Sequence, residues 1–141
     1  MRHVVVVDTN VLFSGLWSRM GASHRVLELI LEGNVCPALS VPLVLEYEMV
    51  LKRESAALGR TAREIEGLLD YLCRIGQHQE IHFLWRPTLR DPRDELVLEL
   101  AVAARCEYIV THNTRDFVGT DLFGVTPLTP GAFLRILGEQ P

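Results

Sequence analysis

Four carboxylates and one amide stand at positions from which they could act together on a metal ion or a phosphate. They are Asp8, Glu46, Asp94, Asp116 and Asn113. Acids within about 4–6 Å of one another raise each other's pKa, so such a group must either be protonated or share a cation. Because these donors are all oxygens, Mg²⁺ or Mn²⁺ suits them better than zinc. Mg²⁺ also binds substrate phosphates, so the pattern favours phosphodiester hydrolysis.

The positions of three of these side chains follow from the strands that precede them. Residues 3–7, HVVVV, are a continuous apolar run typical of a strand buried on both faces, and Asp8 comes directly after it. Asn113 and Asp116 follow a second apolar stretch at 108–111. Ligands of open parallel sheets bind outside the carboxyl ends of the strands. If the two strands are neighbours, these three side chains meet at one edge of the sheet.

Several of these residues also have ordinary structural explanations. Asp8 could begin a loop in which Thr9 and Asn10 are turn or cap residues. Glu46 borders the apolar side of a helix, where a glutamate costs free energy unless it is paired. A metal ion would pair with it, but its stem could instead pack on the helix while its carboxylate stays in water.

The segment DPRD, residues 91–94, has the pattern of a helix start. Asp91 can cap the helix, Pro92 can be its first residue, and Asp94 can interact with free backbone N–H groups of the first turn. A capping role for Asp91 is compatible with a ligand role for Asp94, because a first-turn side chain can face the same edge of the sheet.

Composition and charge are those of one folded domain, residues 1–141, with 48% hydrophobic residues and a net charge of −4. This charge leaves no electrostatic footprint for generic nucleic-acid binding. Without Asp8, Glu46, Asp94 and Asp116, the remaining 14 acids equal the 14 Lys and Arg residues. The excess negative charge would then lie in the proposed pocket.

Strand-like and helix-like segments alternate along the chain, which predicts an α/β fold. We expect a three-layer sandwich with a central parallel sheet of four to five strands flanked by helices. Strands are expected at 3–7, within 34–41, and at 80–84, 108–111 and 124–128. Helices are expected at 23–32, 42–53, 61–75, 91–105 and from Pro130 onward.

The predicted helix at 61–75 carries apolar residues at helical spacing on one side. This stripe should pack on the core, or else contact another copy or another protein. The stripe consists of Ile65, Leu68, Leu69, Leu72 and Ile75.

The three cysteines, Cys36, Cys73 and Cys106, are far apart in the sequence and odd in number, so we expect reduced thiols. No apolar stretch approaches the roughly 20 residues that span a bilayer. The N-terminal apolar run is too short for a signal peptide, so a cytoplasmic location is expected.

The sequence resembles the PIN-domain nuclease family, and in particular the VapC-like toxin components of toxin–antitoxin pairs. The resemblance covers nearly the whole chain. It implies a PIN-like fold and a metal-dependent endonuclease that usually cleaves RNA with one or two Mg²⁺ or Mn²⁺ ions. It also implies a small antitoxin as partner and allows a homodimer. The resemblance is carried by DTNVLFSGL (8–16), SVPLVLEYEMVL (40–51), DPRDELVLELAVAARCEYIVTHNTRDF (91–117) and LTPGAFL (128–134).

The acids of the family's catalytic and metal site map onto Asp8, Glu46, Asp94 and a fourth position after the fourth strand. Many members have an aspartate soon after the strand threonine, where this chain has Asn113. Asp116, three residues later, is the expected substitute. An asparagine oxygen can hold a metal-bound water but adds no charge, so the departure bears on a second metal ion more than on the first.

Further residues are candidates for supporting roles. Thr9, Asn10, Ser14 and Thr111 could orient the metal ligands, although each could instead cap the backbone. Two arginines next to the acids could contact phosphate, or could be solvated side chains paired with a neighbouring acid. These arginines are Arg93 and Arg115.

Two other classes of function remain as alternatives. One is a catalytically quiet PIN-fold module that binds a protein partner, which the departure at Asn113 leaves open. The other is an aspartate-dependent phosphatase with Asp8 as nucleophile. Against it, Asn10 stands where such enzymes carry a second aspartate, and Lys52 is the only lysine in the chain.

Overall fold

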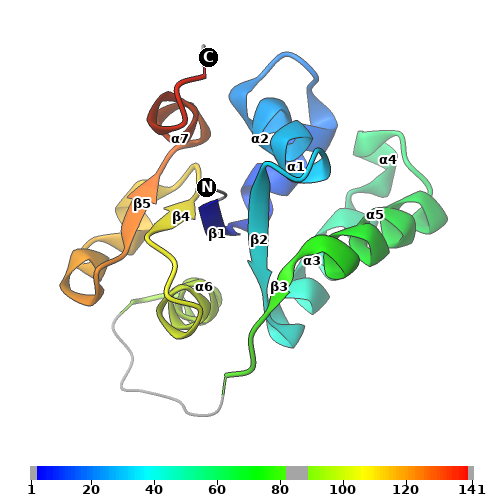
Figure 1. The fold of residues 1–141 in the computed structure, drawn as a ribbon. Coiled ribbons are helices and arrows are strands. Elements are labelled where there is room, and N and C mark those ends of the chain that lie inside the picture. Colours follow the sequence, from blue (N-terminus) through cyan, green and yellow to red (C-terminus); the bar gives the residue numbers. More distant parts are fainter. Residues whose placement is uncertain (1–2, 82–88, 140–141) are drawn as a thin grey trace.

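A parallel β-sheet forms the centre of the computed structural model, which describes residues 3–81 and 89–139 (Figure 1). In this part of the chain the sheet has five strands in the order β3-β2-β1-β4-β5, and every neighbouring pair is parallel. The strands are β1 (His3–Val7), β2 (Val35–Leu39), β3 (Gln77–His78), β4 (Tyr108–Val110) and β5 (Thr126–Leu128).

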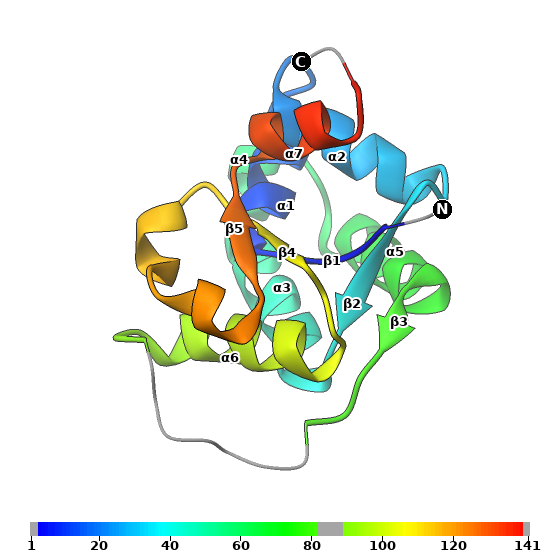
Figure 2. The same cartoon turned by 60° about the vertical axis from the view of Figure 1, so that its left-hand side comes forward.

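Helices cover both faces of the sheet. In two views, α6 lies on one side of β1 and β4, while α2 and α7 lie on the other (Figures 1 and 2). The predicted three-layer α/β fold is therefore confirmed. The helices are α1 (Thr9–Trp17), α2 (Ala22–Leu31), α3 (Val41–Arg53), α4 (Ser55–Leu58), α5 (Ala62–Ile75), α6 (Pro92–Ala103) and α7 (Pro130–Ile136). Two short 3₁₀ helices, η1 (Thr114–Phe117) and η2 (Thr120–Phe123), lie between β4 and β5.

Strand β1 occupies the middle of the sheet, as its apolar sequence predicts. Val5, Val6 and Val7 are at most 1% exposed, because β2 and β4 flank the strand and helices cover its faces. Their β-branched side chains favour an extended backbone and pack well on a pleated surface. The buried valines hold the end of β1, and therefore Asp8, in a defined position.

The starts of α6 and α5 follow capping rules. The Asp91 side chain accepts a hydrogen bond from the Arg93 N–H at 2.9 Å, and Pro92 is the first residue of α6, as predicted. Thr61 and Glu64 form a reciprocal capping box at the start of α5. Each cap satisfies backbone N–H groups that have no partner within the helix.

The apolar stripe of α5 packs inward. Ile65, Leu69 and Leu72 are buried, and α5 lies against α3 and β2. This agrees with the expectation of core packing. The stripe is therefore largely unavailable to a partner.

The strand expected at 80–84 is wrong in its position. The third strand is Gln77–His78, Glu80 and Ile81 lie outside it, and residues 82–84 fall outside the described part of the chain. The reason lies in β2, which ends at Leu39 because Ser40 caps α3. The hydrogen bond from the Gln79 N–H to the Leu39 carbonyl is therefore the last one between these two segments among the described residues.

Helix α1 was absent from the predicted elements. Its sequence, TNVLFSGLW, contains a glycine and several residues with weak helix propensity, so local signals do not favour a helix. Tertiary packing stabilises it, since Val11 and Leu12 are buried in the core and α1 packs against α2 and α3.

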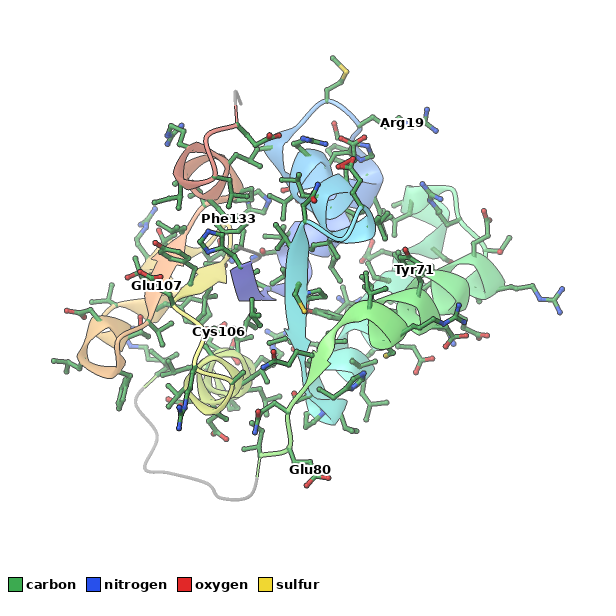
Figure 3. All side chains as sticks on the ribbon, in the orientation of Figure 1. Arg19, Tyr71, Glu80, Cys106, Glu107 and Phe133 are labelled. Carbon is green, nitrogen blue, oxygen red and sulfur yellow. The ribbon has the colours of Figure 1, made fainter. Side chains whose placement is uncertain are left out.

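The last helix completes one face of the core. Phe133, labelled in Figure 3, lies on α7 and is fully buried. Its ring centroid lies 6.2 Å from those of His3 and Tyr108. All three cysteines are free thiols, which agrees with the sequence; Cys36 and Cys106 are buried. None of the helices in the described ranges combines the length and apolar character needed to cross a bilayer.

Candidate active site

A cleft of about 470 Å³ opens at the carboxyl end of the parallel strands. It collects side chains from α1, α3, the start of α6 and the segment after β4. All five oxygen-bearing candidates line it, so the structure brings together residues from distant parts of the sequence. The predicted site residues that line this cleft are Asp8, Thr9, Asn10, Glu46, Arg93, Asp94, Asn113 and Asp116.

Asp8 is held where β1 ends and α1 begins. Its backbone N–H donates to the Val110 carbonyl at 2.9 Å, which ties it to the neighbouring strand β4. Two side chains donate to the same carboxylate oxygen, Asp8 Oδ2: the Thr111 hydroxyl at 2.7 Å and the Asn10 amide at 3.4 Å. The orientation of this carboxylate is therefore set by neighbours that follow both strands.

Thr111 connects Asp8 with the segment that carries Asn113. Its side chain is fully buried, and its hydroxyl also accepts the Asn113 N–H at 3.0 Å. Asn113 then accepts the Asp116 N–H through its carbonyl at 3.0 Å, at the start of η1. A single buried threonine thus links one acid to the turn that presents the other.

Glu46 turns toward the cleft from the middle of α3. Its Oε2 accepts a hydrogen bond from the Thr9 hydroxyl at 2.5 Å, which joins α3 to the first residue of α1. Glu46 also borders the buried residues Leu43 and Tyr47 of the same helix. Its carboxylate is therefore positioned by a hydrogen bond across the cleft.

Tyr47 anchors the same helix to β1. The ring is 1% exposed, and its hydroxyl donates to the carbonyl of Val7, the residue before Asp8. Burial, followed by the charges of Asp8 and Glu46, raises the pKa of this phenol well above its ordinary value, so Tyr47 remains a neutral donor.

The carboxylates influence each other's protonation. Burial is the main cause that raises the pKa of Asp8, and the charges of Glu46 and Asp116 raise it further, against hydrogen bonds from Thr111 and Thr9. Burial and the charges of Asp8, Asp91 and Asp116 raise the pKa of Asp94 to about 6. The acids lie close enough to repel one another.

Within the described part of the chain, this cluster of acids has no direct ion pair with a lysine or arginine. The cluster consists of Asp8, Glu46, Asp94 and Asp116. Arg93 pairs instead with Asp91, at 3.4 Å. The charge of Arg93 still offsets part of the rise in the pKa of Asp94, so the site is a concentration of carboxylate oxygens that is only partly compensated.

This donor set fits a hard divalent cation. In the described ranges, no three Asp, Glu, His or Cys side chains are drawn together into a ready-made metal cluster. Mg²⁺ does not require one, since it keeps several waters and binds through one or two carboxylates. Asp8, Glu46, Asp94 and Asp116 line the cleft with Asn113, so any one or two of these carboxylates could hold such an ion while water completes its coordination.

Three of the predicted supporting residues do not line this cleft. Thr111 is buried and acts on the cleft through Asp8, whereas Ser14 is not among the lining residues and makes no such contact with the acids. Arg115 lines two adjoining hollows, one shared with Asp94 and Asp116 and the other with Asn113 and Asp116. Arg115 is therefore beside Asp94 and Asp116 but outside the main cleft.

Sequence reasoning overlooked four residues of the cleft. Helical spacing could have found three of them: Phe13 lies four residues after Thr9, while Val50 and Arg53 lie four and seven residues after Glu46. Each of these three therefore shares a helix face with a predicted site residue. The overlooked lining residues are Phe13, Val50, Arg53 and Glu54.

Comparison with solved structures supports the fold. The chain is similar to a protein in the crystal structure of VapBC2 from Rickettsia felis bound to a DNA fragment from their promoter. The TM-score is 0.59 at 14% sequence identity, and the match covers 89% of this chain and 98% of the other. At this identity, the likeness shows a shared fold.

Comparison of sequences supplies the family. No curated protein matches the chain in a direct search. The sequence profile of the PIN domain, in contrast, matches residues 4–115, which include every candidate acid except Asp116. Taken with the parallel sheet and the acidic cleft at its carboxyl edge, this match shows that the chain belongs to the PIN domain family.

Proposed function

We propose that this protein is a Mg²⁺- or Mn²⁺-dependent endoribonuclease and the toxin of a toxin–antitoxin pair. One observation carries the proposal: Asp8, Glu46, Asp94, Asn113 and Asp116 line a single cleft, and no cationic side chain of the described ranges is paired to these acids. The match to the PIN domain, a family of nucleases, supports hydrolysis of phosphodiester bonds. The likeness to a VapBC protein supports the toxin role.

In the proposed reaction, different residues of the chain bind the cation, orient its ligands and contact the phosphate. Asp8, Glu46, Asp94 and Asp116 would hold the cation, and Thr111, Thr9 and Asn10 would keep Asp8 and Glu46 in orientation. Arg93 lines the same cleft and is 64% exposed, so its guanidinium can reach a phosphate. A bound divalent cation would stabilise charge on the scissile phosphate and activate water.

The decisive experiment is cleavage of RNA by the purified chain with Mg²⁺ or Mn²⁺, and with a chelator in parallel. The same strand made as DNA tests the preference for RNA. Asp8→Asn and Asp94→Asn serve as inactive variants. Equal cleavage by the native chain and both variants would point to contamination or to another site, while absence of cleavage in all conditions would favour the quiet binding module.

Thr111→Val is expected to weaken metal binding about 10- to 100-fold, the usual effect of losing a hydrogen bond that orients a ligand. Valine keeps the shape of the buried side chain but cannot donate to Asp8 Oδ2, so the carboxylate becomes harder to ionise. Isothermal titration with Mn²⁺ measures the change. Thr111→Ser retains the hydroxyl and should bind Mn²⁺ nearly as the native chain does; equal affinity of all three proteins would contradict this role.

Raising the pH from about 5 to 7.5 is expected to destabilise the metal-free protein and to strengthen metal binding. The folded state raises the pKa of Asp94 from 3.8 to about 6 and raises that of Asp8, so it binds more protons than the unfolded chain between these values. Stability is then lost as the pH rises through this window. Metal binding requires ionised carboxylates, so affinity increases over the same range.

Thermal melts at both pH values, with and without Mn²⁺, measure these two effects. Asp94→Asn removes the titration of Asp94 together with its repulsion of Asp8, Asp91 and Asp116, and leaves the other side chains in place. The variant should show a smaller loss of melting temperature between pH 5 and 7.5. An identical pH profile for native and variant proteins would exclude Asp94 as the source.

An exposed stripe on α3 supports the proposed protein partner. Val41, Leu45 and Met49 are 73%, 57% and 54% exposed and recur every four residues, so they form one apolar line on the helix. We infer that the antitoxin contacts this side of α3, because the chain resembles a protein of a VapBC structure. The proposed location of the complex is the cytoplasm.

A further inference from the structure

We propose that the wall of the cleft formed by Phe13, Val50 and Arg53 binds one unpaired nucleotide of a single-stranded nucleic acid. The base would stack on Phe13 and pack against Val50, and Arg53 would contact the adjoining phosphate. This proposal rests on the nuclease function proposed above and specifies the form of its substrate. We call these three residues the nucleotide wall.

The nucleotide wall continues the two helix faces that carry acidic-site residues. Phe13 lies one turn beyond Thr9 on α1, and Val50 and Arg53 lie one and two turns beyond Glu46 on α3. Because α1 and α3 pack together, these side chains line one cleft with the carboxylates. A strand whose phosphate reaches the acids therefore places its next nucleotide beside this wall.

The aromatic and aliphatic side chains of the wall suit a nucleotide base better than they suit a sugar–phosphate backbone. Phe13 is half-buried: it packs on the core and also lines the cleft. Val50 is also half-buried and adds an aliphatic surface to the cleft. An aromatic ring next to a phosphate site accepts a base by stacking, which depends little on sequence. In a duplex the bases are already stacked inside, so an unpaired strand is favoured.

Arg53 supplies the positive charge of this wall. Its side chain is 61% exposed, and its ion pair is with the adjacent Glu54 at 3.6 Å, a surface contact that contributes little. Its guanidinium is thus available for a phosphate. Arg93 lines the same cleft from the start of α6, whereas Arg53 comes from the end of α3. A strand lying across the acids would contact both.

The test is binding of a fluorescein-labelled single-stranded RNA of about 12 nucleotides, a length within the usual span of such sites, measured by anisotropy. The Asp94→Asn background prevents cleavage during the titration. Phe13→Leu should weaken binding about 10-fold, and Phe13→Tyr should bind as before because it keeps the ring. Arg53→Gln should weaken binding and lower the slope of log affinity against log salt by about one. Arg53→Lys should retain most of the affinity.

Matched controls lie outside the cleft. Phe123→Leu removes another partly exposed phenylalanine, and Arg74→Gln removes an exposed arginine in the last turn of α5. Both should bind RNA as the background protein does. Thermal melts of Phe13→Leu and Phe13→Tyr show whether each variant is folded. In the otherwise native chain, Phe13→Leu and Arg53→Gln should raise KM more than they lower kcat.

The outcomes separate this inference from the proposed function. Metal-dependent cleavage that is lost in Asp8→Asn but unchanged in Phe13→Leu and Arg53→Gln would overturn the nucleotide wall and leave the nuclease standing. Binding that depends on Phe13 and Arg53, without cleavage by the native chain, would support the wall and remove the nuclease. Equal affinity for the same RNA in a duplex, or no binding of the single strand, would also overturn the wall.

Discussion

Asp8→Asn is expected to abolish RNA cleavage while making the metal-free protein more stable. The rate should fall at least about 10³-fold, because metal-ion catalysis supplies several kcal/mol and each ~1.36 kcal/mol is a factor of ten. The introduced amide would be similar in size to the carboxylate and could still accept the Thr111 hydroxyl, but it would lack the charge that attracts the cation. Single-turnover cleavage with Mn²⁺ measures the loss.

The gain in stability has a separate cause. Burial and the charges of Glu46 and Asp116 raise the pKa of Asp8, so the folded protein without metal holds this carboxylate at a cost in free energy near neutral pH. Removing the charge removes that cost. The melting temperature at pH 7.5 without metal should therefore increase, and added Mn²⁺ should stabilise the variant less than the native chain.

Asp70→Asn is the matched control, since Asp70 is exposed on α5 and does not line the cleft. This variant should cleave and melt as the native chain does. If Asp8→Asn cleaved at the native rate, the cleft would not be the active site. If it lost activity together with stability, the loss would reflect misfolding and the electrostatic account of Asp8 would be wrong.

Tyr47→Ala is expected to lower the free energy of unfolding by about 3–5 kcal/mol, the usual cost of deleting a buried aromatic side chain. The ring fills the space between α3 and the end of β1, and its hydroxyl donates to the Val7 carbonyl. Urea denaturation measures the change. Tyr47→Phe keeps the ring and loses the hydroxyl, so it should cost only about 1–2 kcal/mol.

Tyr71 provides the comparison for this prediction. It lies on α5, is 39% exposed, and donates to the Leu31 carbonyl at 3.2 Å (Figure 3). Tyr71→Ala should therefore destabilise the protein much less than Tyr47→Ala. Similar losses for the two alanine variants would show that Tyr47 does not anchor α3. Such a result would also remove the structural link between Glu46 and Asp8 that runs through this tyrosine.

The sequence predicted correctly those elements whose start or end is marked by residues within the element itself. The valine run of β1 and the Asp91-Pro92 start of α6 both appear as expected. The strand at 80–84 and helix α1 show where such signals fail. The position of β3 depends on where its neighbour β2 ends, and α1 depends on burial of residues with weak helix propensity.

The sequence predicted which residues belong to the candidate site better than it predicted how they are arranged in space. Asp8 follows β1 and Asn113 follows β4, but only the sheet order makes these two strands neighbours although they lie far apart in the chain. Glu46 borders an apolar stripe, and that position by itself is compatible with either solvent or the cleft. The packing of α3 on α1, with the Thr9 hydrogen bond, turns it toward the acids.

The amino-acid sequence by itself determined which oxygens were available and that buried strands and capped helices would present them at element ends. The tertiary structure alone decided that they line one cleft, that Thr111 orients Asp8, and that Phe13 and Arg53 belong to the same cleft. The physical reason is the separation along the chain over which each kind of interaction acts. Capping and hydrophobic periodicity act within a few residues, whereas strand order and helix packing depend on contacts between distant parts of the chain.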